Sequence, residues 1–329
     1  MVLKTVCVLL GALTGTVPIA AGAATAPDFP TRPIRLILPV GPGGGQDTTA
    51  RAMNQKLTEE LGQSVIIDPR PGGGGNIAAL TTARATPDGY TLLNISTTAV
   101  TTPLVYEAPY DLQRDFTAVT QLVTNPYLLV ATPSLPAKSI GELVTYSKAN
   151  PDKLAFASAG SGSLTHLGME ILKLQTGISM THVPYKGMGP TGPDLMSGRV
   201  HLGLWSIVSA QPHVRSGRLK ALAVSGAQRA RAAPEVPTIA ESGVPGFAVT
   251  QWYGVVAPVR TPRPIVERLS RAMSASIRDP EVAARVAHDG AEPVGSTPQQ
   301  FAAHLKAEHV KWAKIVQQTG IREQVREAR

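Results

Sequence analysis

The chain has 329 residues, of which 43% are hydrophobic and 16% charged. This is enough apolar material for two domains of ordinary size and argues against global disorder. The formal net charge is +8, but no run of five basic residues occurs. A small anionic ligand therefore fits the charge as well as nucleic acid does, and we expect no nucleic-acid partner.

The N-terminal stretch predicts a secretory signal peptide rather than part of the fold. Lys4 precedes an apolar segment at 6–13, and small residues with two Ala-x-Ala matches follow. We therefore expect residues 1–26 to be removed on export. Because Cys7, the only cysteine, lies inside this stretch, the mature chain can form neither a disulfide nor a thiolate metal site. No later stretch reaches membrane-spanning length, so we expect a periplasmic protein that is not itself inserted in a membrane.

A strand, a glycine loop and a helix follow one another near the start of the mature chain. Residues 34–38 form a short apolar run typical of a buried strand. Gly43, Gly44 and Gly45 come next, and Asp47 is expected to cap the helix. Free amides and the helix dipole point the same way at such a junction, which makes it a candidate anion site. A tight turn with a capping aspartate is the alternative.

Two further strands of the first half end in comparable loops. Residues 64–68 lead into a glycine-rich loop, and residues 90–95 lead into a polar loop of Ser96, Thr97 and Thr98. In open α/β sheets the carboxyl ends of the strands line the ligand crevice. We therefore expect the three loops to lie at one edge of a sheet.

The alternation resumes after Pro133 and predicts a second α/β unit. Its strand patterns, like those of the first half, end in serine, glycine or an isolated polar residue. The expected fold is a two-lobed α/β architecture with a hinge of crossing strands and a cleft between the lobes. Strand patterns outside the first three lie at 119–123, 127–131, 154–157, 180–183, 200–205, 219–224 and 249–257. Residues 27–124 and 248–329 would form lobe 1, and residues 125–247 lobe 2.

The remainder of the chain predicts helices that complete lobe 1. Thr297 and Gln300 form a capping box for a long final helix, with Pro298 at its first position. The residues expected on the buried face of this helix are Phe301, Leu305, Trp312 and Val316.

The segment from Ser158 to His166 is rich in serine and glycine at a predicted helix start. Ser158, Gly160 and Ser163 would supply hydroxyls and amides for a carboxylate or phosphate. A purely structural cap is the next interpretation. A nucleophilic serine paired with His166 is the third, because the Gly-x-Ser-x-Gly elbow is absent.

No cofactor, metal or catalytic constellation is expected. Gly73-x-Gly75-x-x-Ala78 superficially matches a dinucleotide fingerprint, but the next strand ends without the acidic residue that would hold a ribose. Neither glycine loop carries the Gly-Lys-Ser/Thr of a P-loop. His304-x-x-x-Glu308-His309 differs by one residue from zinc-binding helical motifs and is interpreted as a solvated helix face.

Taken together, these motifs resemble the Bug family, the extracytoplasmic solute receptors of tripartite tricarboxylate transporters. The resemblance covers residues 29–321, and its specificity lies in the order and spacing of the motifs. They are Pro39-Val40-Gly41-Pro42-Gly43-Gly44-Gly45-Gln46-Asp47, Arg70-Pro71-Gly72, Asn76-Ile77, Pro87-Asp88-Gly89-Tyr90-Thr91-Leu92-Leu93, Pro109-Tyr110-Asp111, Phe156-Ala157-Ser158, Ser163-x-x-His166-Leu167, His182-Val183-Pro184-Tyr185-Lys186-Gly187 and Ala221-Leu222-Ala223-Val224.

This resemblance implies a type II periplasmic-binding-protein fold that closes around a small organic acid. It implies that backbone amides, hydroxyls and ordered waters hold the carboxylates. The ligand-binding residues carried over by motif are Gly43, Gly44, Asp47, Ser96, Thr97 and Thr98 in lobe 1, and Ser158, Gly160, Ser163 and His166 in lobe 2.

Two positions depart from the family pattern. His201 stands where an acid is usual, and Trp205 stands where a polar residue is frequent. Trp205, Trp252 and Tyr253 lie on predicted strands near the cleft, where a ring can belong to the core or stack on a ligand. We expect at least one of them in the core and place Trp205 at the cleft. A ligand that is larger or less polar than an amino-dicarboxylate, such as an aromatic acid, would then follow.

The sequence thus predicts a monomeric receptor that is not an enzyme. It would bind a small carboxylate, close by population shift and deliver the ligand to the membrane subunits of a tripartite transporter. A secreted Ser/His hydrolase using Ser161 or Ser163 with His166 is one alternative. A ligand sensor that contacts a signalling partner is the other.

Overall fold

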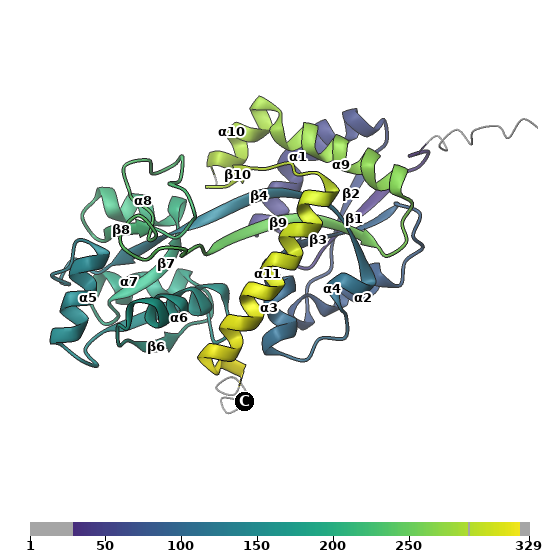
Figure 1. The fold of residues 1–329 in the computed structure, drawn as a ribbon. Helices are drawn as coiled ribbons and strands as arrows, with labels where there is room; N and C mark the ends of the chain where they lie inside the picture. Colours follow the sequence, from purple (N-terminus) through teal and green to yellow (C-terminus); the bar gives the residue numbers. More distant parts are fainter. Residues whose placement is uncertain (1–28, 289, 323–329) are drawn as a thin grey trace, which may run out of the picture.

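A computed structural model describes residues 29–288 and 290–322, so the predicted signal peptide lies outside the described residues. Strand order is β2-β1-β3-β9-β4-β7-β5-β6, with β8 and β10 paired to β4. Figure 1 shows two groups of elements joined by long strands, which we call the first and second lobes. The exact lobe boundaries given above stay predictions.

The first lobe is built on three parallel strands, in which β1 lies between β2 and β3. A helix follows each strand directly or after a short turn. The elements are β1 (Ile34–Leu38), α1 (Gly45–Leu61), β2 (Val65–Pro69), η1 (Gly73–Gly75), α2 (Asn76–Ala83), β3 (Thr91–Ser96), α3 (Thr98–Val105) and α4 (Leu112–Asp115). The start of α3 corrects the expected polar loop, because Thr98 is already helical.

The second lobe repeats the arrangement with β5 between β6 and β7 as parallel neighbours. Its β7 and β8 pair antiparallel with β4. The elements are α5 (Ile140–Ala149), β5 (Ala155–Ser158), α6 (Leu164–Thr176), β6 (Thr181–Pro184), η2 (Gly189–Thr191), α7 (Gly192–Ser197), β7 (Leu202–Ser206), α8 (Ile207–Arg215) and β8 (Lys220–Val224).

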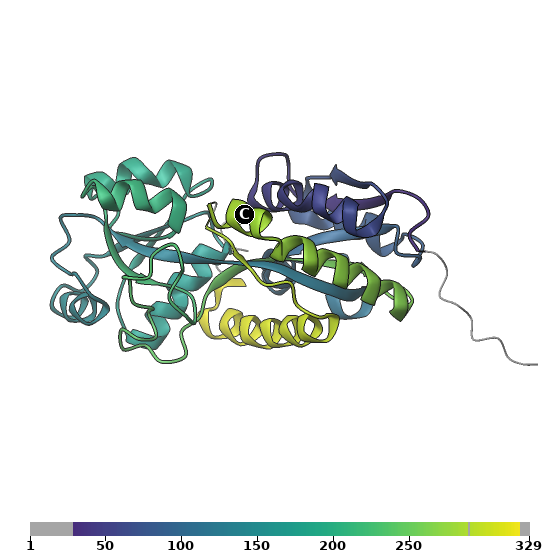
Figure 2. The same ribbon diagram turned by 90° about the horizontal axis from the view of Figure 1, so that it is seen from above.

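Two antiparallel strands, β4 (Phe116–Ala131) and β9 (Thr250–Pro258), run between the lobes (Figure 2). The separate strands expected at 119–123 and 127–131 are one continuous strand. Asn125 and Pro126 look like a break in the sequence, but β9 pairs alongside both of them. The same β4 then pairs with β7 and β8, so one strand belongs to both lobes and forms the predicted crossing connection.

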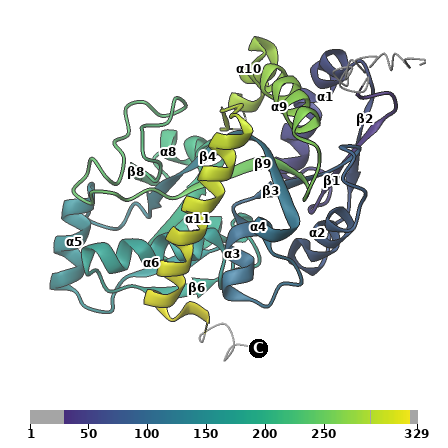
Figure 3. The same cartoon turned by 45° about the vertical axis from the view of Figure 1, so that its right-hand side comes forward.

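The C-terminal elements return to the first lobe, and the last helix crosses the junction. They are α9 (Arg263–Arg278), α10 (Pro280–His288), β10 (Glu292–Pro293) and α11 (Pro298–Thr319). Figure 3 shows α11 passing in front of β4 from one lobe to the other, and it contacts α3 and α6. The predicted capping box and the four buried residues on this helix are confirmed.

A buried carboxylate fastens α11 to β9. Glu308 is 6% exposed and accepts hydrogen bonds from the indole nitrogens of Trp252 (3.1 Å) and Trp312 (2.8 Å). Lys311 pairs with the same carboxylate. The interpretation of this helix face as solvated is therefore wrong for Glu308, which is buried. It is also wrong for His304, whose half-buried ring lies against Trp252 and Phe301, whereas His309 is exposed as expected. Trp252 is fully buried, which confirms that at least one of the three rings belongs to the core.

The core has two main layers on opposite faces of the sheet. The cluster under α1, α9 and α10 belongs to the first lobe alone. The cluster under α3, α6 and α11 is continuous from Ile37 in the first lobe to Leu204 in the second. Among the residues described, no helix is long and apolar enough to cross a membrane.

Candidate ligand-binding site

Three helix N-termini of the first lobe lack side-chain caps. The N-cap residues of α1, α2 and α3 are Gly44, Gly75 and Thr97, and none of their side chains accepts a capping bond. The first-turn amides of a helix have no intrahelical acceptor. Because α1, α2 and α3 follow neighbouring strands, these N-termini lie along one edge of the sheet.

Asp47 holds the first loop rather than capping the helix, which corrects the expectation. It lies in the first turn of α1 and accepts from the backbone nitrogen of Gly43 (2.9 Å) and from Arg51 Nε (2.9 Å). The hydrogen bond from Arg51 lowers the pKa of this carboxyl, with smaller contributions from Gly43. Asp47 is only 2% exposed, so its carboxylate holds the loop in position from the buried side, whereas Gly43 is exposed.

Tyr253 lies against the start of α1. A Cβ atom at Gly45 would overlap its hydroxyl, so a larger residue there would force Tyr253 or the start of α1 to move. Tyr253 is directly opposite Ser96 in the β3–β9 ladder and is 8% exposed. Burial raises its pKa, so the hydroxyl remains protonated. The sequence names this residue only as one ring among three, because its approach to Gly45 depends on strand pairing.

The hydroxyl groups of the third loop have two different roles: one stabilises the fold, and two lie together at a cavity. Thr97 is fully buried, donates to Thr250 O and accepts from the backbone nitrogen of Trp252, so it ties α3 to β9. Ser96 and Thr98 hydrogen-bond each other at 2.7 Å between their hydroxyl oxygens. Thr98 is exposed and Ser96 is 2% exposed.

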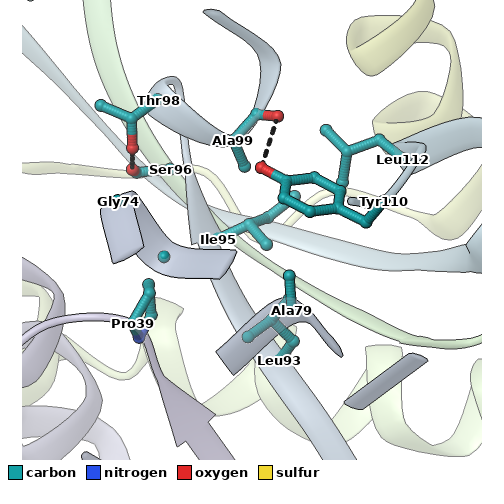
Figure 4. A pocket seen from close by; sticks show the side chains of 11 residues that line it. Pro39, Gly74, Ala79, Leu93, Ile95, Ser96, Thr98, Ala99, Tyr110 and Leu112 are labelled. Atoms are coloured by element: carbon teal, nitrogen blue, oxygen red, sulfur yellow. Dashed lines mark hydrogen bonds between the residues drawn. The ribbon is translucent and has the colours of Figure 1, made fainter. Parts of the chain in front are cut away.

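All three first-lobe loops meet at one small cavity of about 30 Å³. Figure 4 shows Ser96 and Thr98 on one side of this cavity and Tyr110 and Leu112 on another. Its remaining lining residues are Pro39, Gly74, Gly75, Ala79, Leu93, Ile95 and Ala99. The predicted loops at the ends of β1, β2 and β3 are therefore brought together in space.

The second-lobe loop at 158–163 satisfies its own amides. The backbone nitrogen of Ala159 donates to Thr165 Oγ1, and that of Gly160 donates to Ser158 Oγ. The backbone nitrogen of Gly162 donates to His166 Nδ1. Ser163 caps α6 by accepting from the backbone nitrogen of His166. The structural cap that the sequence left open is thus present. Contact of this loop with a ligand stays a prediction.

His166 belongs to a buried aromatic stack below this loop. Its ring lies 3.6 Å from that of His182 and nearly parallel to it. The His182 ring stacks on Phe156, whereas the His166 ring is tilted against Phe156 at 6.0 Å. Burial, with smaller contributions from His182 and Lys173, lowers the pKa of His166 to about 3. Burial and then Lys173 lower that of His182 to about 4. Both rings are therefore neutral near pH 7.

This geometry does not support a hydrolase. Ser163 Oγ bonds the backbone nitrogen of His166 and not its ring, and Nδ1 of the ring accepts from Gly162. The serine–histidine pair that is formed, Ser158 Oγ to His182 Nε2 at 2.7 Å, has a serine with no exposed surface.

Trp205 is packed inside the second lobe. It is 6% exposed, lies against Gly192 and meets the ring of His213 edge-on. His201 is likewise structural, since its Nδ1 accepts from the backbone nitrogen of Ala155. Little of the Trp205 ring is free in this conformation, so ligand stacking on it stays a prediction without support from the packing.

A hydrogen bond beside the site connects the two lobes. The hydroxyl of Tyr106, at the end of α3, donates to the backbone oxygen of Ser161 at 3.1 Å. Tyr106 also lies against Gly162, where a Cβ would crowd it. Among the described residues, no group of three or more His, Cys, Asp or Glu could hold a metal ion.

Two α/β lobes connected by crossing strands, with loops facing each other at the strand ends, define a periplasmic solute-binding protein. Residues 49–321 match the family model described as the tripartite tricarboxylate transporter family receptor. The chain is 37% identical over 315 residues to Protein BugT of Bordetella pertussis, covering 95% of this chain and 96% of that protein. The chain belongs to this receptor family, as its motifs predicted, and is a binding protein rather than an enzyme.

Solved structures agree with this assignment. One is a Rhodopseudomonas palustris protein with adipate, 38% identical with a TM-score of 0.75, covering 89% of this chain and 99% of that one. Another is MatC of the same species with bound malate, 34% identical with a TM-score of 0.70, covering 88% of this chain and 100% of that one.

Proposed function

We propose that this receptor captures a small carboxylate in the periplasm and delivers it to the membrane subunits of a tripartite transporter. The observation that carries the proposal is the meeting of three uncapped helix N-termini at one cavity edge in the first lobe. Unpaired amides and aligned helix dipoles favour an anion without a charged side chain. The relatives solved with adipate and malate support the same ligand class.

In this mechanism the first lobe binds and the second lobe closes. A carboxylate would accept from the amides of Gly44 and Gly45 and from the hydroxyl of Thr98. Asp47 and Ser158 would not contact the ligand and would instead hold their loops in position. A ligand that meets both lobes only in the closed state shifts the population toward closure by its differential affinity.

A thermal-shift and calorimetric screen of the secreted chain tests the proposal. The panel holds mono-, di- and tricarboxylates, including adipate and malate, with matched amides and alcohols as controls. A ligand at about a hundred times its dissociation constant stabilises the fold by about 2.7 kcal/mol. We expect shifts with acids and none with their amides. Shifts with no acid, or equal shifts with the amides, would contradict carboxylate recognition.

Delivery is tested separately by uptake. Cells that carry both membrane subunits should accumulate the radiolabelled acid only when this receptor is present. Unchanged uptake without the receptor would contradict the delivery step and leave the binding result intact.

A further inference from the structure

Three hydroxyl groups line the cavity between the first-lobe loops, and each already has a hydrogen-bond partner. Two of them belong to Ser96 and Thr98, which bond each other. The hydroxyl of Tyr110 donates to the backbone oxygen of Ala99 at 3.2 Å (Figure 4). No other side chain of its lining carries a polar atom. A charged group placed deep in this cavity would be desolvated without a partner, which disfavours it strongly.

The size of the cavity limits what enters it. A volume of about 30 Å³ exceeds the roughly 10–15 Å³ needed for one water molecule but leaves no room for an aromatic ring. Ala79 on α2, Leu93 and Ile95 on β3, and Leu112 give it apolar walls. The group that suits such a space is small and apolar.

We propose that this cavity is a subsite for one methyl-sized apolar substituent of the bound acid. The carboxylate would stay on the loop amides, and the substituent would point between α2 and α3 into the cavity. This inference rests on the proposed function and adds the class of acid: a carboxylate that carries a small alkyl or halogen branch. It also assigns Ala79 as a specificity-determining residue, because its small side chain leaves the space open.

Leu112 sets the depth of the subsite. It lines this cavity and also a second groove of about 330 Å³ on the other side, which Val100, Phe116 and Leu305 border. Truncating this half-buried side chain would lengthen the subsite toward the groove. A larger side chain at Ala79 would fill the cavity and a smaller one at Leu112 would lengthen it. We therefore expect the two changes to have opposite effects on the size of the substituent that the site prefers.

The test compares each acid with its branched counterpart by calorimetry: succinate with methylsuccinate, malate with 2-methylmalate, and adipate with 3-methyladipate. For the unaltered protein we expect the methylated acid of a binding pair to bind roughly fourfold tighter, the value for burying one methyl group. In Ala79→Val this preference for the methylated acid should vanish. Ala83→Val is the matched control, one turn along α2 and outside the cavity lining, and should keep the preference.

If circular dichroism shows that Ala79→Val does not fold properly, Leu112→Ala provides an independent test of the subsite. It should shift the preference from the methyl to the ethyl branch, measured with ethylsuccinate. A methylated acid that binds no tighter than its parent to the unaltered protein would overturn the subsite, as would an Ala79→Val protein that keeps the preference. If no acid of any pair binds, the proposed function itself fails, which is a different result from binding without a branch preference.

Discussion

The loops at the strand ends of the two lobes look alike in sequence and differ in what their amides do. In the second lobe the helices that follow β5 and β7 are capped by Ser163 and Ser206, whereas η2 and α7, which follow β6, have no side-chain cap. In the first lobe α1, α2 and α3 have no such caps. Serine and glycine at a helix start therefore indicate two opposite states, amides already satisfied and amides left for a ligand. The difference suggests a binding lobe and a closing lobe.

The largest effect is expected where the first-lobe loop has no spare room. Gly45→Ala would push a methyl group into the Tyr253 hydroxyl, so either the Tyr253 side chain or the N-terminus of α1 must shift. We expect at least a tenfold loss of carboxylate affinity by calorimetry, and a destabilisation of about 1–3 kcal/mol from overpacking.

Two further variants separate sterics from loss of a glycine. Gly41→Ala, where no atom lies within 4 Å of the new Cβ, should bind normally. Tyr253→Phe combined with Gly45→Ala should recover part of the affinity. A Gly45→Ala protein with unchanged affinity would contradict the assignment of α1 as a binding element.

Acid should weaken the second lobe through its histidine pair. Because the pKa values of His166 and His182 are lowered to about 3 and 4, the unfolded chain binds more protons than the folded one below their ordinary value of 6.5. Stability is therefore full above about pH 6.5 and declines as the pH falls toward 4. The slope approaches about 1.4 kcal/mol per pH unit for each ring.

Melting temperatures between pH 7.5 and 4.5 measure this slope. His166→Asn keeps an acceptor near Gly162 but cannot titrate, so it should reduce the slope by about half. Glu170 and Lys173, which flank the ring, are unchanged in this variant. An unchanged slope in His166→Asn would contradict burial of a neutral ring.

Much of this architecture follows from the sequence because it depends on local patterns. Apolar runs that end at a proline or a serine place β1, β3 and β5, and the Thr297–Gln300 box places the start of α11. Partners far apart in the chain leave no such signal. The sequence around Glu308 is typical of an exposed helix face, and its burial depends on the indoles of Trp252 and Trp312, which come from different elements. The position of Tyr253 beside the first-lobe loops depends on the pairing of β9 with β3. The cavity is likewise formed by residues from four separate stretches of the chain.

The smallest effects distinguish the two kinds of serine directly. Ser163→Ala removes the α6 cap and should cost about 1 kcal/mol of unfolding free energy with less than a twofold change in carboxylate affinity. Ser96→Ala should do the reverse, weakening binding severalfold at nearly constant stability, since Thr98, its side-chain partner among the described residues, is exposed. Urea unfolding gives the unfolding free energy of each variant, and calorimetry gives the carboxylate affinity of each. If Ser163→Ala lost more affinity than Ser96→Ala, the second lobe would be the binding lobe, and the cap seen at α6 would have to open when the ligand arrives.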